Sequence, residues 1–156
     1  RGGVLMQIST TPPPDQVALA LRSLARDMGD PYRMDAALLA RLLGDSAGTT
    51  GAVLAGDAVP VGVALYSLFA STTRGQIGAF VTDLWVDETQ RGTGLGRALL
   101  ASVRDAVAAR WGATFLRLNY YADNPGAAAF YARLGFTPQP KEIWVTLEGT
   151  QLEALA

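Results

Sequence analysis

A glycine-rich stretch that runs directly into an amphipathic helix constrains this chain more than any other feature. Residues 91–96 have the sequence RGTGLG, and the helical pattern RALL follows at residues 97–100. Glycine has no Cβ, so the main chain can approach a bound anion closely there. The first N–H groups of a helix have no partners within it, and the positive end of the helix dipole lies beside them. The stretch therefore predicts a phosphate-binding loop.

Two common phosphate-binding motifs do not fit this spacing. A dinucleotide fingerprint needs glycine or alanine two residues beyond Leu95, where Arg97 stands, and it needs an acidic residue about 20 positions further on. A Walker loop needs Gly-Lys followed by Ser or Thr, which is absent. Taken alone, the stretch is also compatible with a ligand-free turn between a strand and a helix.

A second stretch, residues 124–136, predicts a short helix with both of its ends marked. Asn124 is a favourable N-cap, Pro125 suits the first helical position, and Gly135 suits a left-handed terminator. Tyr131 shares one face of this helix with apolar neighbours, so its ring points toward whatever the helix packs against. On this pattern alone, Tyr131 is an ordinary core residue.

Together, the two stretches resemble the GNAT superfamily of acyl-CoA-dependent N-acyltransferases. The family signature is an Arg/Gln-x-x-Gly-x-Gly/Ala loop followed by Asn, Ala and Tyr-x-x-x-Gly-Phe, and both halves occur here in order between residues 80 and 136. The resemblance implies acetyl-CoA as the cofactor, with its pyrophosphate bound by the loop. The residues implied at or beside the phosphates are Arg91, Gly92, Thr93, Gly94, Leu95, Gly96 and Arg97.

The resemblance also implies how the pantetheine arm of coenzyme A is held. In the family, strands four and five splay apart and the arm lies between them. The main chain of Leu84, Trp85 and Val86 would bind the pantetheine amides, while their side chains pack in the core. Asn124 would lie near the same arm, although capping its own helix is the role that its position predicts directly.

Composition narrows the chemistry that is open to the chain. It has 156 residues, 49% of them hydrophobic, a formal net charge of -1, and neither cysteine nor histidine. These values favour one domain, and the mixed charges argue against a nucleic-acid surface. Thiol nucleophiles, histidine bases and the usual zinc-ligand sets are excluded. We expect no metal site and no membrane segment, and therefore a cytoplasmic enzyme.

The pattern along the chain predicts one mixed α/β (α+β) domain over residues 1–156. Strands are expected at residues 4–9, 50–55, 59–69, 76–86, 114–120 and 142–147, and helices at residues 15–28, 34–44, 95–110 and 124–135. The implied GNAT-like fold has a largely antiparallel central sheet of about seven strands, with strands four and five splayed, flanked by about four helices. We expect residues 1–5 to precede a natural start at Met6, and residues 149–156 to form a tail.

Amide formation sets two proton requirements. A lysine-type amine has a pKa of about 10.4, so presenting it uncharged at pH 7 costs about 4.6 kcal/mol, and an α-amino group costs about a third of that. The departing thiolate needs only about 2 kcal/mol of help. Following the resemblance, Tyr131 would donate that proton as the general acid and would also contact the cofactor.

The sequence leaves the general base open. Some small-amine members of the family have Glu-Asp on strand four, and here the pair is Thr82-Asp83. In a regular strand Asp83 faces the side opposite Thr82, so it can inherit the role of the glutamate only if a bulge re-aims it. Asp83 is the candidate catalytic carboxylate. There are two alternatives to this role. Asp83 can be a structural aspartate, or the base can be a water chain that ends at Asp83 or Asp30.

The acceptor site implied by the resemblance borders the turn between the first two helices and the loop ahead of residue 124. The residues it nominates are Asp30, Tyr32, Tyr120, Tyr121 and Asp123. Acids and aromatic rings suit a cationic amine through charge and cation–π contact. We therefore expect a small-molecule primary amine as the substrate rather than a protein N-terminus.

Three functional classes follow from these observations. The first is an acetyl-CoA-dependent N-acetyltransferase that acts by direct attack in a ternary complex, on a small amine or, as the alternative, on a protein N-terminus or lysine. The second is a catalytically silent acyl-CoA-binding sensor domain, because the glutamate is missing. The third is a nucleotide-binding module of another fold. Open sheet edges and the apolar residues 143–147 also favour a homodimer.

Overall fold

The structure is a computed structural model, and it describes residues 6–112 and 114–155. The chain forms two compact units, Arg1–Asn119 and Tyr120–Ala156. The expectation for residues 1–5 lies outside the described residues.

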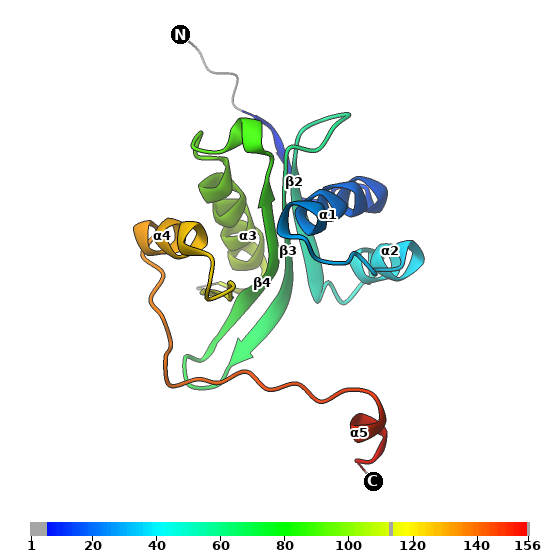
Figure 1. The fold of residues 1–156 in the computed structure, drawn as a ribbon, viewed down its shortest axis with the longest axis vertical. Helices are drawn as coiled ribbons and strands as arrows, with labels where there is room; N and C mark the ends of the chain where they lie inside the picture. Colours follow the sequence, from blue (N-terminus) through cyan, green and yellow to red (C-terminus); the bar gives the residue numbers. More distant parts are fainter. Residues whose placement is uncertain (1–5, 113, 156) are drawn as a thin grey trace. The chain divides into compact units, whose positions relative to one another are not determined.

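The first unit is built on a mixed sheet of five strands among the described residues, in the order β1-β2-β3-β4-β5 (Figure 1). The strands are β1 (Ile8–Ser9), β2 (Thr50–Ala55), β3 (Gly62–Ser71), β4 (Gln76–Val86) and β5 (Leu116–Leu118). Neighbours from β1 to β4 are antiparallel, and β5 runs parallel to β4. The α/β class and the largely antiparallel sheet expected from the sequence are confirmed.

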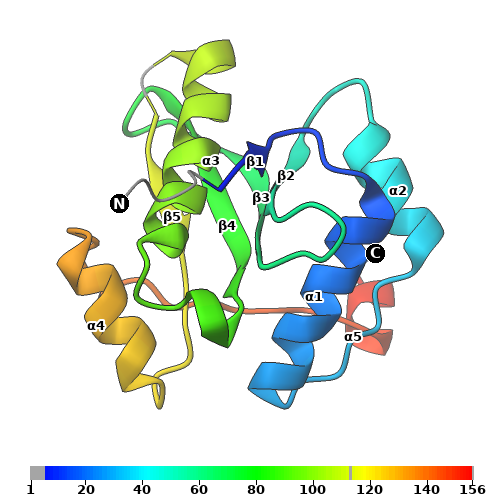
Figure 2. The ribbon, with the colours of Figure 1, turned by 90° about the horizontal axis from the view of Figure 1, so that it is seen from above.

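Helices cover both faces of this sheet (Figures 1 and 2). α1 (Pro14–Met28) and α2 (Ala36–Gly44) lie on one face, and α3 (Leu95–Trp111) lies on the other. The core under α1 and α2 contains Val17, Leu21 and Leu39 together with Trp85 of β4. On the opposite face, Gly62 of β3 leaves room for the side chains of α3, because a Cβ there would meet two leucine methyl groups at 3.0 and 3.2 Å.

The second unit contains α4 (Pro125–Arg133) and α5 (Thr150–Glu153). The predicted ends of α4 are confirmed. The Asn124 side chain accepts a hydrogen bond from the Ala127 N–H at 3.0 Å, and Pro125 is the first helical residue. Gly135 is left-handed with φ 91°, and the Phe136 N–H donates to the Tyr131 carbonyl at 3.0 Å. This is the geometry of a glycine-terminated helix.

Several expected bounds are corrected. β2 and β4 have the predicted limits, but β3 begins at Gly62 rather than Val59, because Pro60 has no N–H to pair. β1 is limited to Ile8–Ser9 and β5 to Leu116–Leu118. Helix α1 begins at Pro14, one residue before the expected start, with Pro13 as its N-cap. Asp35 caps α2 by accepting from the Leu38 N–H at 2.9 Å.

The expected strand at residues 142–147 is absent from the described structure, so the sheet has five of the six strands expected from the pattern, where the resemblance implied about seven. Ile143 and Val145 are 84% and 87% exposed, and they pair with no strand of the described chain. Alternating apolar residues make a stable strand only where a sheet edge pairs with them. Within the expected tail, residues 150–153 form α5.

Candidate active site

The glycine-rich stretch forms the turn that opens α3. A 3₁₀ turn at Glu88–Gln90 follows β4, Gly92 and Gly94 take left-handed φ values of 77° and 91°, and α3 begins at Leu95. The first helical hydrogen bond runs from the Ala98 N–H to the Gly94 carbonyl at 3.0 Å. The N–H groups of the three preceding residues, 95–97, have no hydrogen-bond partner among the described residues.

This turn fits a bound pyrophosphate. The first turn of α3 carries no acidic side chain, so the positive end of its dipole is not neutralised there. A Cβ built on Gly92 or Gly94 would have no neighbouring atom within 4 Å. Space for an anion therefore lies over the free amides. Glycine is required at these two positions by their positive φ values, and not by neighbouring atoms that would clash with a Cβ.

Arg91 is held in place by contacts with α1 and with the end of β4. Its Nη2 donates to Asp27 Oδ2 at 3.2 Å, and its Nε donates to the Val86 carbonyl at 3.1 Å. The same oxygen of Asp27 accepts from Trp85 Nε1 at 2.9 Å. One carboxylate in the last turn of α1 thus connects the core tryptophan of β4 to the start of the glycine turn.

A β-bulge changes the direction of the side chains in the second half of β4. Leu65 pairs with Asp83 and Tyr66 pairs with Val81, which leaves Thr82 as the extra residue. Its hydroxyl donates to the Leu65 carbonyl at 3.3 Å. Paired residues in an antiparallel sheet share a face, so Asp83 lies with Leu65 on the side covered by α1 and α2. The bulge that the sequence argument required is present.

Strand β5 pairs with β4 only over Ala79–Val81. Residues 82–86 of β4 continue beyond that point and pair with no part of β5. The outer edge of this segment, which includes Leu84 and Val86, therefore has main-chain groups directed away from β3 and not used by a described strand. This arrangement agrees with the expected splay of the two strands.

Tyr32, in the connection between α1 and α2, lies near enough to Asp83 for the charge of that carboxylate to act on its pKa. Burial raises the pKa of Tyr32, the Arg22 charge opposes that shift, and the charge of Asp83 adds to it. The Arg22 guanidinium is 5.3 Å from the centre of the Tyr32 ring. The Tyr32 hydroxyl is buried and has no hydrogen-bond partner among the described residues. Burial also raises the pKa of Asp83, against a smaller lowering by a hydrogen bond from Thr82.

The other predicted acceptor residue of the first unit, Asp30, follows α1 directly. Its N–H donates to the Ala25 carbonyl at 2.9 Å and so closes the end of the helix. The charge of Asp83 acts on Tyr32, so the first unit brings these two predicted residues together. Asp27 was not predicted, because its partners lie 58 and 64 residues away in the sequence and no local pattern reports such contacts.

Tyr131 belongs to an aromatic cluster of the second unit. Its ring stacks on Tyr120, with centroids 5.6 Å apart, and makes edge contacts with Phe130 and Phe136 at 5.1 and 5.5 Å. Burial raises the pKa of the Tyr131 hydroxyl, so it stays protonated at neutral pH. Tyr121, whose carbonyl accepts from the Asn124 N–H at 3.0 Å, is exposed, as is the predicted acceptor residue Asp123.

Within the described ranges, no group of three or more acidic side chains could hold a metal ion. A search of the same residues finds no helix that is long and apolar enough to cross a membrane.

The chain belongs to the Acetyltransferase (GNAT) family, because a sequence model of that family matches residues 17–136. The matched region contains the glycine turn, the bulged half of β4 and Tyr131. The resemblance identified from the sequence motifs is thereby confirmed. No curated protein matches the chain significantly in sequence.

Solved structures show the same fold over nearly the whole chain. A putative acetyltransferase from Arthrobacter sp. FB24 is 27% identical, with 96% of each chain covered and a TM-score of 0.71. An aminoglycoside acetyltransferase from an uncultured soil metagenomic sample, solved with sisomicin, is 15% identical over 92% of this chain and 95% of that chain, with a TM-score of 0.73. A ribosomal-protein-alanine N-acetyltransferase from Brucella melitensis biovar Abortus 2308 is 21% identical over 92% and 98%, with a TM-score of 0.67.

Proposed function

We propose that this protein is an acetyl-CoA-dependent N-acetyltransferase that acts on a primary amine of a small molecule by direct attack in a ternary complex. The observation that carries the proposal is the bulge in β4, which turns Asp83 toward the α1–α2 side and beside Tyr32. A carboxylate in this position compensates for the glutamate that the sequence lacks.

The chain offers two sets of main-chain groups for the cofactor. The free N–H groups of residues 95–97 would hold the pyrophosphate, with Arg97 beside them on the exposed surface of α3. The unpaired edge of β4 at residues 84–86 would bind the amides of the pantetheine arm. When bound, acetyl-CoA supplies the acetyl group and a thiolate as the leaving group.

Asp83 is the proposed general base. Its pKa is raised by burial, which brings the carboxylate closer to the range in which it can take a proton from an ammonium group. The unpartnered hydroxyl of Tyr32 would donate a hydrogen bond beside it and orient the amine. Both groups serve a cationic substrate, because a carboxylate attracts the ammonium form and an aromatic ring binds it through cation–π contact.

Tyr131 is the proposed general acid. A phenol whose pKa is raised above its ordinary value keeps its proton at neutral pH and can give it to a developing thiolate. The stacking on Tyr120 and the edge contacts with Phe130 and Phe136 restrict the orientation of the ring. Asn124 uses its side-chain oxygen to cap α4, so any contact with the pantetheine would come from its amide nitrogen.

A small amine is the preferred acceptor. The nominated acceptor residues Asp30 and Tyr32, together with the proposed base Asp83, add two acids and an aromatic ring, and Arg22 is the cation over that ring. The excess of acidic groups suits an amine-bearing compound. The fold is shared with an enzyme that acts on aminoglycosides and with one that acts on a ribosomal-protein alanine, so the fold alone does not select between these classes. The exposed apolar residues 143–147 support the homodimer expected from the sequence, which stays a prediction.

Acetyl-CoA is expected to raise the melting temperature of the protein. A ligand that binds only the native state stabilises it by about 2.7 kcal/mol at a hundredfold excess over its Kd. NAD and ATP should have much smaller effects, because the turn lacks their motifs. Differential scanning fluorimetry with the three compounds measures this directly. No response to coenzyme A at millimolar concentration would contradict the proposal, and binding without turnover on any amine would favour the sensor alternative.

Tyr131→Phe is expected to lower kcat by about 10²-fold or less while KM for acetyl-CoA stays nearly unchanged. The substitution keeps the ring that stacks on Tyr120 and removes only the hydroxyl. The thiolate needs little assistance, so the effect lies at the low end for a general acid. Single-turnover kinetics measures it, with Tyr66→Phe, at a β3 position outside the proposed acetyl-transfer site, as the matched control. Unaltered single-turnover rates would show that Tyr131 only packs in the aromatic cluster and is not the general acid.

Asp27→Ala is expected to destabilise the fold by about 1–3 kcal/mol, because it leaves the indole N–H of Trp85 without a partner. Trp85 is only 4% exposed, so water cannot replace the carboxylate freely. Urea denaturation measures the change. Asp105→Ala is the control, since it removes only the exposed pair with Arg104, which is worth about 0–1 kcal/mol. Equal effects of the two variants would show that the Asp27 contacts are not stabilising.

A further inference from the structure

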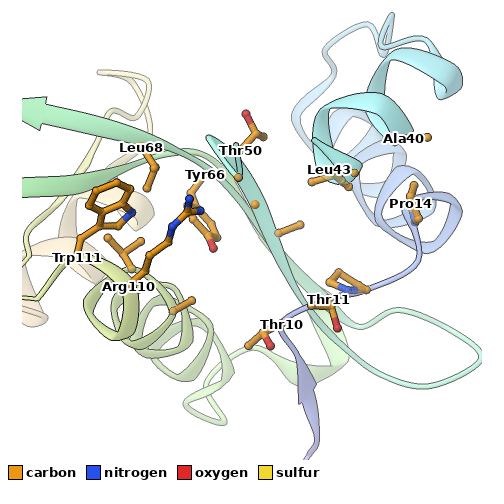
Figure 3. Close-up of a pocket in the computed structure, with 17 residues that line it drawn as sticks. Thr10, Thr11, Pro14, Ala40, Leu43, Thr50, Tyr66, Leu68, Arg110 and Trp111 are labelled. Atoms are coloured by element: carbon orange, nitrogen blue, oxygen red, sulfur yellow. The ribbon is translucent and has the colours of Figure 1, made fainter. Parts of the chain in front are cut away.

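A pocket of about 410 Å³ lies at the outer edge of β2, between α2 and α3 (Figure 3). Trp111, the last residue of α3, borders the pocket, whereas the glycine turn lies at the opposite end of the same helix. A 17-residue helix is about 25 Å long. The pocket therefore shares no residue with the proposed acetyl-transfer site.

Arg110 provides the only cationic side chain of the pocket lining. Its guanidinium lies 5.1 Å from the centre of the Trp111 ring, and no ion pair or hydrogen bond joins it to any residue in the described part of the chain. Asp45, a nearby acid of the α2 end, uses its carboxylate to accept from the Ala47 N–H at 3.3 Å. The N–H groups of Arg110 are therefore available to an external anion.

Two glycines leave the space that the side chains of Arg110 and Tyr66 occupy beside this pocket. A Cβ on Gly48 would overlap the guanidinium of Arg110, and a Cβ on Gly51 would overlap the phenol of Tyr66. Gly51 pairs with Tyr66 across β2 and β3, so the ring of Tyr66 extends over the glycine to the sheet edge. Burial raises the pKa of Tyr66, which keeps its hydroxyl a donor at neutral pH. Figure 3 shows Arg110 extending from α3 toward the strands.

We propose that this pocket binds a small organic carboxylate with an apolar body. The planar fork of the Arg110 guanidinium matches the two oxygens of a carboxylate, and the Tyr66 hydroxyl supplies a further donor. The remaining walls combine apolar side chains, such as Leu43, Leu68 and Val107, with the threonines at positions 10, 11 and 50. An apolar lining with a small number of polar groups is typical of small-molecule sites. A single cation does not suit a polyphosphate.

Isothermal titration calorimetry on the full chain tests the proposal with 3-phenylpropionate as the probe and its neutral amide, 3-phenylpropanamide, as the matched compound. We expect saturable binding of the acid and at least about tenfold weaker binding of the amide, which cannot use the charge of Arg110. Acetate is the third compound. It should bind at least about tenfold more weakly than 3-phenylpropionate, because it lacks an apolar body to fill the pocket.

Variants of the lining residues test whether 3-phenylpropionate binds in this pocket. Arg110→Gln should weaken 3-phenylpropionate at least about tenfold, and Tyr66→Phe should weaken it less. Arg104→Gln, on the exposed surface of the same helix, should have no effect. None of these changes should alter the thermal shift produced by acetyl-CoA. The proposal is overturned if 3-phenylpropionate does not bind, if its amide or acetate binds equally well, or if Arg110→Gln leaves its affinity unchanged while the variant melts as the wild type does.

Discussion

Gly96→Val is expected to abolish the binding of acetyl-CoA while the fold remains intact. Gly96 is the second residue of α3 and has a negative φ, so valine fits the backbone there and has a somewhat higher helix propensity. Its branched side chain would project over the free N–H groups of residues 95–97 and keep the pyrophosphate away from them. Calorimetric titration with coenzyme A should give no measurable heat.

Gly44→Val is the matched control for this experiment. Gly44 ends α2, also lacks a positive φ, and has no atom within 4 Å of a built Cβ. It should bind coenzyme A as the wild type does. Gly94→Val is a poorer test, because its φ of 91° adds backbone strain of about 1–2 kcal/mol to any effect on the ligand. Normal coenzyme A affinity in Gly96→Val would show that the loop is a structural turn and does not bind the pyrophosphate.

Asp83→Asn is expected to lower kcat/KM by about 10²–10⁴-fold at neutral pH. The loss should shrink as pH rises, because more of the amine substrate is then already uncharged. The carboxylate must be ionised to act, and burial raises its pKa, so wild-type activity should rise with pH through that raised pKa. Profiles of kcat/KM against pH for the two proteins measure both effects.

The same substitution should raise the melting temperature at neutral pH. Because the pKa of Asp83 is higher in the folded state than in the unfolded state, ionisation favours unfolding. Stability in the wild type should therefore fall as pH rises from the unfolded pKa through the raised folded pKa, and asparagine removes this loss. A variant that is more stable and less active distinguishes a catalytic carboxylate from a structural one.

Asp30→Asn serves as the control, since Asp30 is the other acid considered as the end of a water chain. The substitution keeps the hydrogen bond from its backbone N–H to the Ala25 carbonyl. Because Asp30 is a nominated acceptor residue, we expect its loss to affect KM for the amine and to leave kcat close to the wild-type value. If Asp83→Asn kept full turnover and Asp30→Asn lost it, the general base would be Asp30, in the turn between α1 and α2, and not Asp83.

Features with local causes could be predicted from the sequence. The bounds of β2 and β4, the glycine turn and both ends of α4 follow from residues that act on their own backbone, such as Asn124 and Gly135. Glycine content, caps and alternation act within a few residues, so a single sequence reports them. The family resemblance rested on these local motifs.

Features with distant causes could not be predicted. The carboxylate of Asp27 acts through Trp85 and Arg91, which are far away in the sequence. The proximity of Tyr32 to Asp83 depends on how α1 and α2 pack on the sheet. Residues 142–147 alternate as a strand would, but their structure depends on whether a partner edge is available, and alternation does not report that.

The face that carries the proposed base depends on the bulge in β4. Side chains along a strand alternate between faces, so if the same residues paired without a bulge, Thr82 would lie opposite Leu65, and Asp83 and Trp85 would point to the α3 side. The indole would then lose Asp27, and the carboxylate would face the leucines and valines of α3. Deleting Thr82 would keep Asp83 opposite Leu65, whereas pairing Thr82 with Leu65 would turn Asp83 to the other face. An alignment that matches the acid alone therefore does not show on which side of the sheet a related chain carries it.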